Sequence, residues 1–344
     1  MIFKKNNIDQ PLFFIYIKNL ISFILFIFIK SLALKSKTDN PKNILFVNTG
    51  QIGDLIISSL VLVNEDKFEN GKEMFLLIKK KYYDLFAHYN GRVKIIYWDY
   101  PLYRFSMLYR IKFLKELQKL NLEYAINITS ARGPNNDEIT IVSGALKKMC
   151  FKSNQKHMRR IFANYYDKHY DRILDFKNKT EFEKQSELLE LLTKKEINRR
   201  AKYFLSNEII AEVESKIDSI RTVQRDKLIV INPMSDIEEK DWSAKNYYEL
   251  NNLFLNDNYL IIYQGSRNQR NKIEKIIPKA KNIINIAGEF TLTQSAALIQ
   301  LADLFIGNDS GFTHIAKALG KPLIGIIGCG SHGIFFPYNE KKIN

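Results

Sequence analysis

The chain has 344 residues, enough for about two domains at roughly 150 residues each. Hydrophobic residues make up 46% and charged residues 26%, as in an ordinary globular protein, which excludes a largely disordered chain and a polytopic membrane protein. Lys and Arg number 52 against 37 Asp and Glu. The net charge of +15 favours phosphates or anionic lipid as ligands, unless it reflects only a compositional bias toward solvated lysines.

The cysteines and the basic runs indicate no further ligand class. Cys150 and Cys329 stand far apart without a CxxC motif, which argues against a disulfide framework and a structural zinc site. The sequence has no RNA-binding signature, zinc finger or helix-turn-helix pattern, and its aromatic residues do not alternate with the basic runs. We therefore expect no nucleic-acid partner.

Residues 12–29 form the one strongly apolar run, interrupted only by Lys18 and Asn19. A membrane-spanning helix needs about 20 apolar residues, and a charge inside it is costly. Three interpretations stay open: a helix lying in or shallowly inserted into the surface of an anionic membrane, a single signal-anchor span, and a hydrophobic extension packed on the protein or a partner. We treat residues 1–42 as a leader, so a chain that starts near Lys42 should keep its fold.

From residue 43 onward, short β-branched runs alternate with amphipathic stretches, the pattern of βαβ units in parallel sheets. Helical spacing in the first half lies near residues 80–89, 103–120 and 181–196. The predicted strands of this half are 43–48, 74–78, 93–98 and 123–128. These elements predict a first domain over residues 43–200, followed by a polar linker over residues 201–226.

The second half repeats this pattern. Thr291 and Gln294 match a capping box, and Ser243 is a further candidate N-cap. The predicted strands are 228–232, 259–263, 283–287, 304–307 and 323–327. We therefore predict an α/β protein with two doubly wound, Rossmann-like domains, the second over residues 227–344. Because ligands of such sheets bind at the carboxyl ends of the strands, the functional residues should lie in the loops there.

The loop after the first strand reads TGQIGD and leads into a helix. It lacks the G-x-G-x-x-G spacing of a dinucleotide fingerprint, so a Rossmann dehydrogenase is disfavoured. Gly50 and Gly53 let the backbone turn tightly and let a substrate approach closely. Asp54 then stands at the start of the helix, where a plain capping role is the alternative to a chemical one.

Four more loops of the second half hold unusual residues. NPMS, at residues 232–235, runs through an acidic stretch to Lys240, and Gly265 and Glu289 follow the next two strands. The sequence GNDSG, at residues 307–311, enters a helix that contains His314. A glycine-flanked turn at a helix N-terminus is a ready anion site. The alternative is that Asp309 or Ser310 only caps this helix and that His314 is only packed.

Taken together, these blocks resemble the bacterial heptosyltransferases, glycosyltransferase family 9. The resemblance covers about residues 43–328, and its most specific part is the GNDSG-x-x-H-x-A-x-x-LG-x-P block at residues 307–322. It implies a GT-B fold and inverting transfer of a sugar, from ADP-heptose in the best-known members, to the lipopolysaccharide core or a related surface glycan. The implied partners are a nucleotide sugar and a lipid-linked anionic glycan, at the cytoplasmic face of the inner membrane.

The resemblance also implies roles for individual residues. Asp54 corresponds to the base that takes the acceptor proton, and Lys240 to a lysine on the donor phosphate. Gly50 and Gly53 form the acceptor-side loop. The implied donor-binding residues are Asn232, Ser235, Lys240, Gly265, Glu289, Asp309, Ser310, Gly311 and His314. No DxD motif is present in the sequence, so we expect no metal and no cofactor, with protein groups meeting the charge of the leaving group.

Two features depart from the family pattern. Met234 and the acidic residues 236–239 replace the usual small residues of the phosphate loop. The family also implies a further helix beyond Asn344 that crosses back to the first domain. Two other functions stay open: a nucleotide-sugar epimerase or hydrolase on the same fold, and a non-catalytic nucleotide- or glycan-binding relative tethered to the membrane. Donor turnover without acceptor would indicate the former, and binding without transfer the latter.

Overall fold

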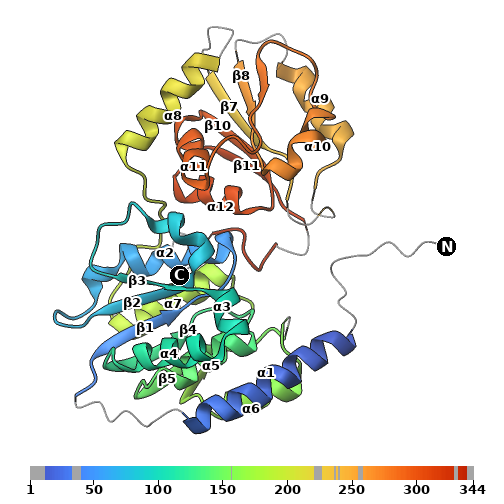
Figure 1. Cartoon of the computed structure of the whole chain (residues 1–344). Coiled ribbons are helices and arrows are strands. Elements are labelled where there is room, and N and C mark those ends of the chain that lie inside the picture. The colour runs from blue at the N-terminus through green and yellow to red at the C-terminus, as the bar shows by residue number, and fades with distance from the viewer. Residues whose placement is uncertain are drawn as a thin grey trace. The chain divides into compact units, whose positions relative to one another are not determined.

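The computed structural model describes residues 12–32, 40–155, 157–220, 227–235, 238, 241–254, 259–328 and 332–338. The chain forms two compact units. The first unit takes in residues 1–50, 60–83 and 91–198, and the second takes in residues 51–59, 84–90 and 199–344. Each unit is built on one parallel sheet, so the predicted α/β class is confirmed (Figure 1).

The first sheet has six parallel strands in the order β3-β2-β1-β4-β5-β6. They are β1 (Asn43–Val47), β2 (Met74–Lys79), β3 (Lys94–Trp98), β4 (Leu122–Asn127), β5 (Lys147–Phe151) and β6 (Arg172–Leu174). All five residues of β1 are buried, as expected for a central strand covered on both faces. The strand order reverses between β1 and β4, which makes the loops after these two strands the natural place for a ligand.

The helices that the sequence predicts for the first half are confirmed except near residues 80–89. The α-helices are α2 (Ile52–Val63), α3 (Tyr100–Phe105), α4 (Met107–Gln118), α5 (Pro134–Val142), α6 (Arg160–Asp167) and α7 (Glu181–Thr193). The helix predicted near residues 80–89 is a 3₁₀ segment, Lys80–Phe86, and a second 3₁₀ segment covers Glu65–Lys67. The sequence predicts no strand for the segments that form β5 and β6.

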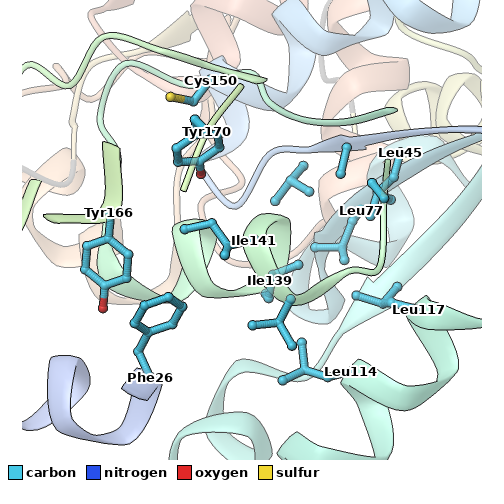
Figure 2. Packing of buried hydrophobic residues seen from close by; sticks show 14 of the residues in the cluster. Phe26, Leu45, Leu77, Leu114, Leu117, Ile139, Ile141, Cys150, Tyr166 and Tyr170 are labelled. Atoms are coloured by element: carbon cyan, nitrogen blue, oxygen red, sulfur yellow. The ribbon is translucent and has the colours of Figure 1, made fainter. Parts of the chain in front are cut away.

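The helix α1 (Leu12–Leu32) is part of the first unit and packs against α5 and α6 (Figure 1). Phe26 and Ile29 belong to the same buried cluster as the strands of the first sheet. Figure 2 shows Phe26 reaching from α1 toward Tyr166 of α6. The predicted boundary at residue 42 therefore does not separate α1 from the first unit, and a chain starting near Lys42 would leave part of this core uncovered. That such a chain keeps its fold stays a prediction. In the described part of the chain, no helix combines the length and apolar character needed to cross a membrane.

The second sheet has five parallel strands in the order β11-β10-β7-β8-β9. They are β7 (Lys227–Asn232), β8 (Tyr259–Tyr263), β9 (Ile283–Asn285), β10 (Leu304–Asn308) and β11 (Leu323–Ile326). All five lie where the sequence predicts strands. The helices around them are α8 (Asn207–Ile220), α9 (Ala244–Phe254), α10 (Arg270–Glu274), α11 (Leu292–Leu301) and α12 (Gly311–Ala318). The predicted capping box of Thr291 and Gln294 is confirmed at the start of α11.

The segment predicted as a polar linker, residues 201–226, needs a correction. It contains α8, which packs against α11 in the second unit. Val213 and Ile217, one helical turn apart, are buried, and the amide of Gln294 donates to Glu212 at 2.8 Å. A narrow apolar stripe on an otherwise charged helix is enough to fix it on a neighbour, although it barely changes the average hydropathy of the segment.

Candidate functional site

Asn308, the last residue of β10, connects several elements at the carboxyl edge of the second sheet. Its side chain is fully buried. The amide nitrogen donates to the carbonyl of Pro233, and the amide oxygen accepts a hydrogen bond of 2.9 Å from the Tyr247 hydroxyl. One amide thus ties the loop after β7 to the end of β10 and to α9. The sequence gives no separate signal for Asn308, because it lies inside the GNDSG block beside Asp309 and Ser310, to which the family pattern assigns donor binding.

Two buried amides at this edge have polar atoms without a partner among the described residues. Asn232, which ends β7, donates to the Met234 carbonyl at 2.9 Å and to the Ser310 hydroxyl at 3.3 Å, but its Oδ1 has no partner there. Gln264, directly after β8, is 2% exposed, and neither its Oε1 nor its Nε2 has a partner there. Buried polar atoms are nearly always paired, so these atoms mark a place for a ligand or ordered water. A polar residue directly after the apolar run YLIIY was the available signal for Gln264.

The helix α12 starts beside Asn232. Ser310 is its N-cap residue by backbone conformation, but its side chain makes no capping hydrogen bond. Instead its hydroxyl accepts from Asn232. The simple alternative, in which Ser310 caps the helix, is therefore wrong. The backbone amide of Asp309 donates to Ile326 of β11 at 3.1 Å, which fixes the turn to the sheet.

His314 lies one turn into α12 and is almost fully buried. Its Nδ1 lies 2.6 Å from the hydroxyl of Tyr338, and its ring lies over that of Phe336 with centroids 4.5 Å apart. A Cβ atom on Gly53 would lie 2.7 Å from the His314 ring. Within the second unit, the first turn of α2 therefore touches α12 directly, and the glycine is required there because a side chain would collide with the imidazole.

Gly311, at the start of α12, makes a second close contact with the first turn of α2. A Cβ atom there would lie 2.8 Å from Cβ of Ile52. The predicted acceptor-side loop and the predicted donor-side helix are thus brought together inside one compact unit. The sequence places these two blocks some 260 residues apart, and no local pattern predicts their contact.

Asp54 occupies the first turn of α2. Its Oδ2 accepts a hydrogen bond of 2.9 Å from the backbone amide of Gln51, so the residue does stabilise the helix start. Gly50 donates its backbone amide to Oδ1 of Asn48 at 2.9 Å, which shapes the preceding turn. The capping contact is compatible with a second, chemical role, which stays a prediction.

The remaining predicted donor residues have structural contacts of their own. The Ser235 amide donates to Asp241 at 2.6 Å, and burial raises the pKa of this carboxyl above its ordinary value, although the hydrogen bonds it accepts oppose the shift. Glu289 forms an ion pair with Arg270 at 2.6 Å. A Cβ atom on Gly265 would lie 2.8 Å from the side-chain oxygen of Gln269. Lys240 lies outside the described residues.

The family model for glycosyltransferase family 9 (heptosyltransferase) matches residues 140–344, more than half of the chain. The chain belongs to glycosyltransferase family 9. The resemblance stated from the sequence is confirmed.

Among curated relatives of this family 9 chain, the lipopolysaccharide core heptosyltransferase OpsX of Haemophilus influenzae is 36% identical over 117 residues, 33% of this chain and 34% of that protein. The chain thus covers about a third of the length of the first curated relatives it matches. A family 9 structure from Veillonella parvula aligns with a TM-score of 0.71 at 18% identity, covering 87% of this chain and 85% of that one. The structure of E. coli heptosyltransferase WaaC with ADP-2-deoxy-2-fluoro heptose aligns with a TM-score of 0.63 at 16% identity, covering 82% of this chain and 88% of that one. At these identities the likeness shows the fold, which is GT-B.

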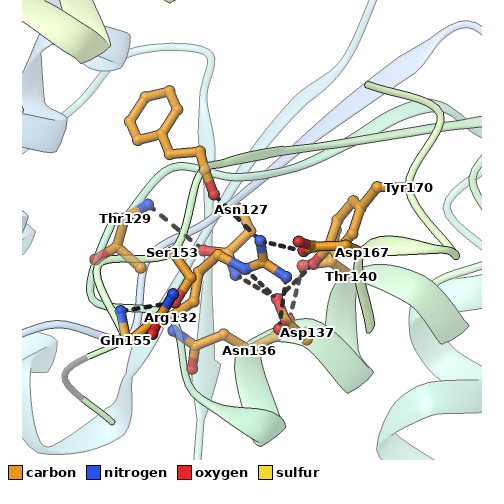
Figure 3. Close-up of polar contacts among 11 residues, drawn as sticks. Asn127, Thr129, Arg132, Asn136, Asp137, Thr140, Ser153, Gln155, Asp167 and Tyr170 are labelled. Atoms are coloured by element: carbon orange, nitrogen blue, oxygen red, sulfur yellow. Dashed lines mark hydrogen bonds and ion pairs between the residues drawn. The ribbon is translucent and has the colours of Figure 1, made fainter. Parts of the chain in front are cut away.

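In the first unit of the family 9 chain, a buried polar network follows β4 (Figure 3). No sequence motif predicted it. Arg132 is fully buried and donates from Nε and Nη2 to the two oxygens of Asp137, both at 2.9 Å. Its Nη1 donates to Asp167 at 2.8 Å, and the Tyr170 hydroxyl donates to Asp137 at 2.7 Å. Burial alone would lower the pKa of Arg132, but the Asp137 charge raises it above its ordinary value.

This network fixes the loop between β4 and α5, at the point where the strand order reverses. Asn127, at the end of β4, joins it by donating to Asp137 at 3.1 Å. A guanidinium whose bidentate partner is equally buried makes a rigid frame, because both planar groups are held in one geometry. The network therefore holds the loop after β4 in one conformation.

Proposed function

We propose that this chain is an inverting, metal-independent heptosyltransferase that moves heptose from ADP-heptose to a lipopolysaccharide core or related surface glycan. Family membership supports sugar transfer, and the similarity to OpsX, a lipopolysaccharide core heptosyltransferase, and to WaaC with its ADP-heptose analogue supports heptose, its ADP carrier and the acceptor class. The observation that carries the donor site is the set of buried side-chain atoms without a partner among the described residues: Oδ1 of Asn232, whose amide nitrogen donates to Ser310 at the start of α12, and both polar atoms of Gln264.

The donor diphosphate would lie at the start of α12. The side chain of Ser310, the N-cap residue, makes no capping hydrogen bond, and the helix start with the positive end of its dipole is suited to an anion. Lys240 would add a positive charge to the diphosphate. The Asn232 oxygen and the Gln264 amide would satisfy their hydrogen bonds on the nucleotide or the sugar. These protein groups would carry the leaving-group charge that a divalent cation carries in enzymes with a DxD motif.

Asp54 would act as the general base. As the acceptor oxygen forms its bond to the anomeric carbon, the hydroxyl proton passes to the Asp54 carboxylate, and the bond from that carbon to the diphosphate oxygen breaks to release ADP. Attack from the face opposite the leaving group inverts the anomeric centre. The contact between Gly53 and His314 supports this assignment, because it holds the Asp54 turn against the helix proposed to bind the donor. A positioned base contributes about 10² to 10⁴ fold.

The acceptor would be a lipid-linked anionic glycan at the cytoplasmic face of the inner membrane, where the positive charge of the chain favours its approach. The two other functions make different products. An epimerase or hydrolase consumes nucleotide sugar without an acceptor, and a non-catalytic relative binds nucleotide and transfers nothing.

The decisive experiment incubates the purified chain with ADP-heptose and with a core acceptor that lacks heptose. ADP release is measured together with the mass of the glycan, with and without EDTA. We expect ADP and a heptosylated product in equal amounts, both unaffected by EDTA. ADP without product would indicate hydrolysis, and ADP binding without turnover would indicate the non-catalytic function. Loss of transfer in EDTA, restored by Mg²⁺, would contradict the metal-independent mechanism.

A second experiment tests the donor site by itself. Gln264→Leu removes a buried amide that has no protein partner among the described residues, so it should leave the fold at least as stable while weakening ADP binding about tenfold, the effect of about one hydrogen bond. Gln185→Leu is the matched control, because Gln185 is an equally buried glutamine in the first unit that donates to Ile128 at 3.3 Å. The control should lose stability and keep its affinity for ADP. Equal ADP affinities in wild type and Gln264→Leu would exclude Gln264 from the donor site.

A further inference from the structure

The helix α1 is held on the first unit by one face only. Asn19, buried within this face, accepts a hydrogen bond of 2.9 Å from the Arg159 backbone amide through Oδ1 and donates to the His157 carbonyl at 3.3 Å. Phe23 packs edge-on against Tyr165 with ring centroids 4.7 Å apart, and Phe26 packs against Tyr166 at 4.8 Å. The polar residue in the middle of the apolar run is therefore a docking residue, and it fixes the rotation of the helix.

The opposite face of α1 is apolar and exposed. Ile24 is 58% exposed and Phe28 is 51% exposed, although most side chains of this size are buried in a globular protein. Six exposed residues recur every three or four positions along this side, and we call them the outer face: Phe14, Ile17, Ile21, Ile24, Phe28 and Leu32. Because Asn19 and Phe26 hold the helix by its other side, the outer face cannot turn inward without breaking those contacts.

Two arginines, Arg159 and Arg160, stand at the start of α6, the helix against which α1 packs. A pocket of about 410 Å³ is lined by Tyr16 of α1 together with Gln155, Arg159, Arg160 and Ile161. Arg159 and Arg160 are exposed, and neither forms an ion pair within the part of the chain that the structure describes. Guanidinium groups bind phosphate oxygens in a bidentate manner, and a tyrosine is typical of the boundary between an apolar and a polar medium.

The charges on and beside α1 are mostly positive. Residues 12–32 include Lys18 and Lys30 but no Asp or Glu, and the first acidic residue after β5 is Asp167, at the end of α6, which is paired with Arg132. An apolar stripe with cations nearby is complementary to a layer of hydrocarbon covered by anionic headgroups. We propose that the outer face and the Arg159–Arg160 pocket together dock the first unit on an anionic phospholipid bilayer, with α1 lying parallel to the membrane and a lipid phosphate in the pocket.

The bilayer is favoured over a protein partner because one phase provides both kinds of contact at the required places. The stripe needs an apolar medium along the whole length of α1, and the adjacent arginines need phosphate at its margin. A helix embedded by one face keeps its backbone hydrogen bonds and needs no partner of defined shape. The proposal concerns location alone and does not depend on the proposed sugar transfer.

The test is co-sedimentation of the full chain with vesicles of phosphatidylcholine mixed with phosphatidylglycerol, compared with vesicles of pure phosphatidylcholine. We expect binding to the mixed vesicles that weakens at high salt. Ile24→Ser and Ile21→Ser should each weaken it about tenfold, because an exposed isoleucine loses its burial in hydrocarbon. Arg160→Ala should weaken binding about fivefold on the mixed vesicles and leave binding to pure phosphatidylcholine unchanged, since each basic residue contributes about 1 kcal/mol near an anionic surface.

The control is Leu253→Ser, which changes an apolar residue of the second unit that is even more exposed than those of the outer face. It should bind as the wild type does. Each variant is first checked by circular dichroism, and two separate isoleucine variants keep the test intact if one misfolds. The proposal is overturned if the wild-type chain ignores mixed vesicles or if Leu253→Ser weakens binding as much as Ile24→Ser. It is also overturned if light scattering finds a dimer without lipid that Ile24→Ser dissociates, because the outer face then belongs to a second copy.

Discussion

The two faces of α1 make opposite predictions for the same substitution. Phe26 is fully buried in the core of the first unit, and Phe28, two residues further along the same helix, is about half exposed. Phe26→Ala removes a ring that packs against Tyr166 and lies 5.7 Å from the ring of His169. We expect this change to destabilise the first unit strongly, whereas Phe28→Ala should leave its stability nearly unchanged.

The magnitude follows from burial. A buried phenylalanine replaced by alanine costs about 3–5 kcal/mol, the lost transfer of the ring from water plus the cavity left behind. An exposed residue away from special contacts costs within about 0.5 kcal/mol. Against a typical total of about 5–15 kcal/mol, the Phe26 variant should still fold but with a clearly lower denaturant midpoint.

The assay uses the two tryptophans of the chain. Trp98 is buried in the same cluster as Phe26, and Trp242 lies in the second unit. In a Trp242→Phe background, fluorescence during urea unfolding reports on the first unit alone. The reasoning is refuted if the two alanine variants unfold at the same urea concentration, or if Phe26→Ala loses less than about 1 kcal/mol. Either result would mean that α1 is not part of the core.

Three further expectations concern other residues. Asp54→Asn keeps an acceptor oxygen for the cap of α2, so ADP affinity should hold while kcat falls by about 10² or more; an unchanged kcat would leave Asp54 as a cap alone. Arg132→Met leaves the Asp137 carboxylate buried without its cation and should cost about 3–5 kcal/mol of unfolding free energy, measured by urea titration; an unchanged midpoint would contradict a structural role for the pair. Burial, aided by the charge of Lys30, lowers the pKa of His169 below its ordinary value of 6.5. The unfolded chain then binds this proton more readily, so stability should fall as the pH drops through 6.5 toward the lowered pKa, and His169→Gln should flatten that profile; parallel profiles would exclude His169 as the cause.

The sequence by itself determined most of the secondary structure and the family. Strands such as Leu228–Asn232 are short runs of β-branched residues between turns, and the capping box of Thr291 and Gln294 needs only four consecutive positions. The GNDSG block is likewise contiguous. Signals of this kind are local, so they survive without any knowledge of what lies nearby in space. Because such signals are local, the sequence does not predict β5. This strand begins with the charged residues Lys147 and Lys148, and its later residues are buried only through packing against neighbouring elements.

The tertiary structure alone decided which side of α1 is covered and which residues line the edge of the second sheet. The run from 12 to 29 is apolar almost all round, so its hydropathy cannot say which face packs on the protein. That choice is made by Asn19, through hydrogen bonds to residues 157 and 159. The contact of Gly53 with His314 and the unpartnered amide of Gln264 have the same origin. Hydropathy shows only that a side chain prefers to leave water. The residues that cover this side chain come from distant parts of the chain, and so does the presence or absence of a hydrogen-bond partner for a buried polar group.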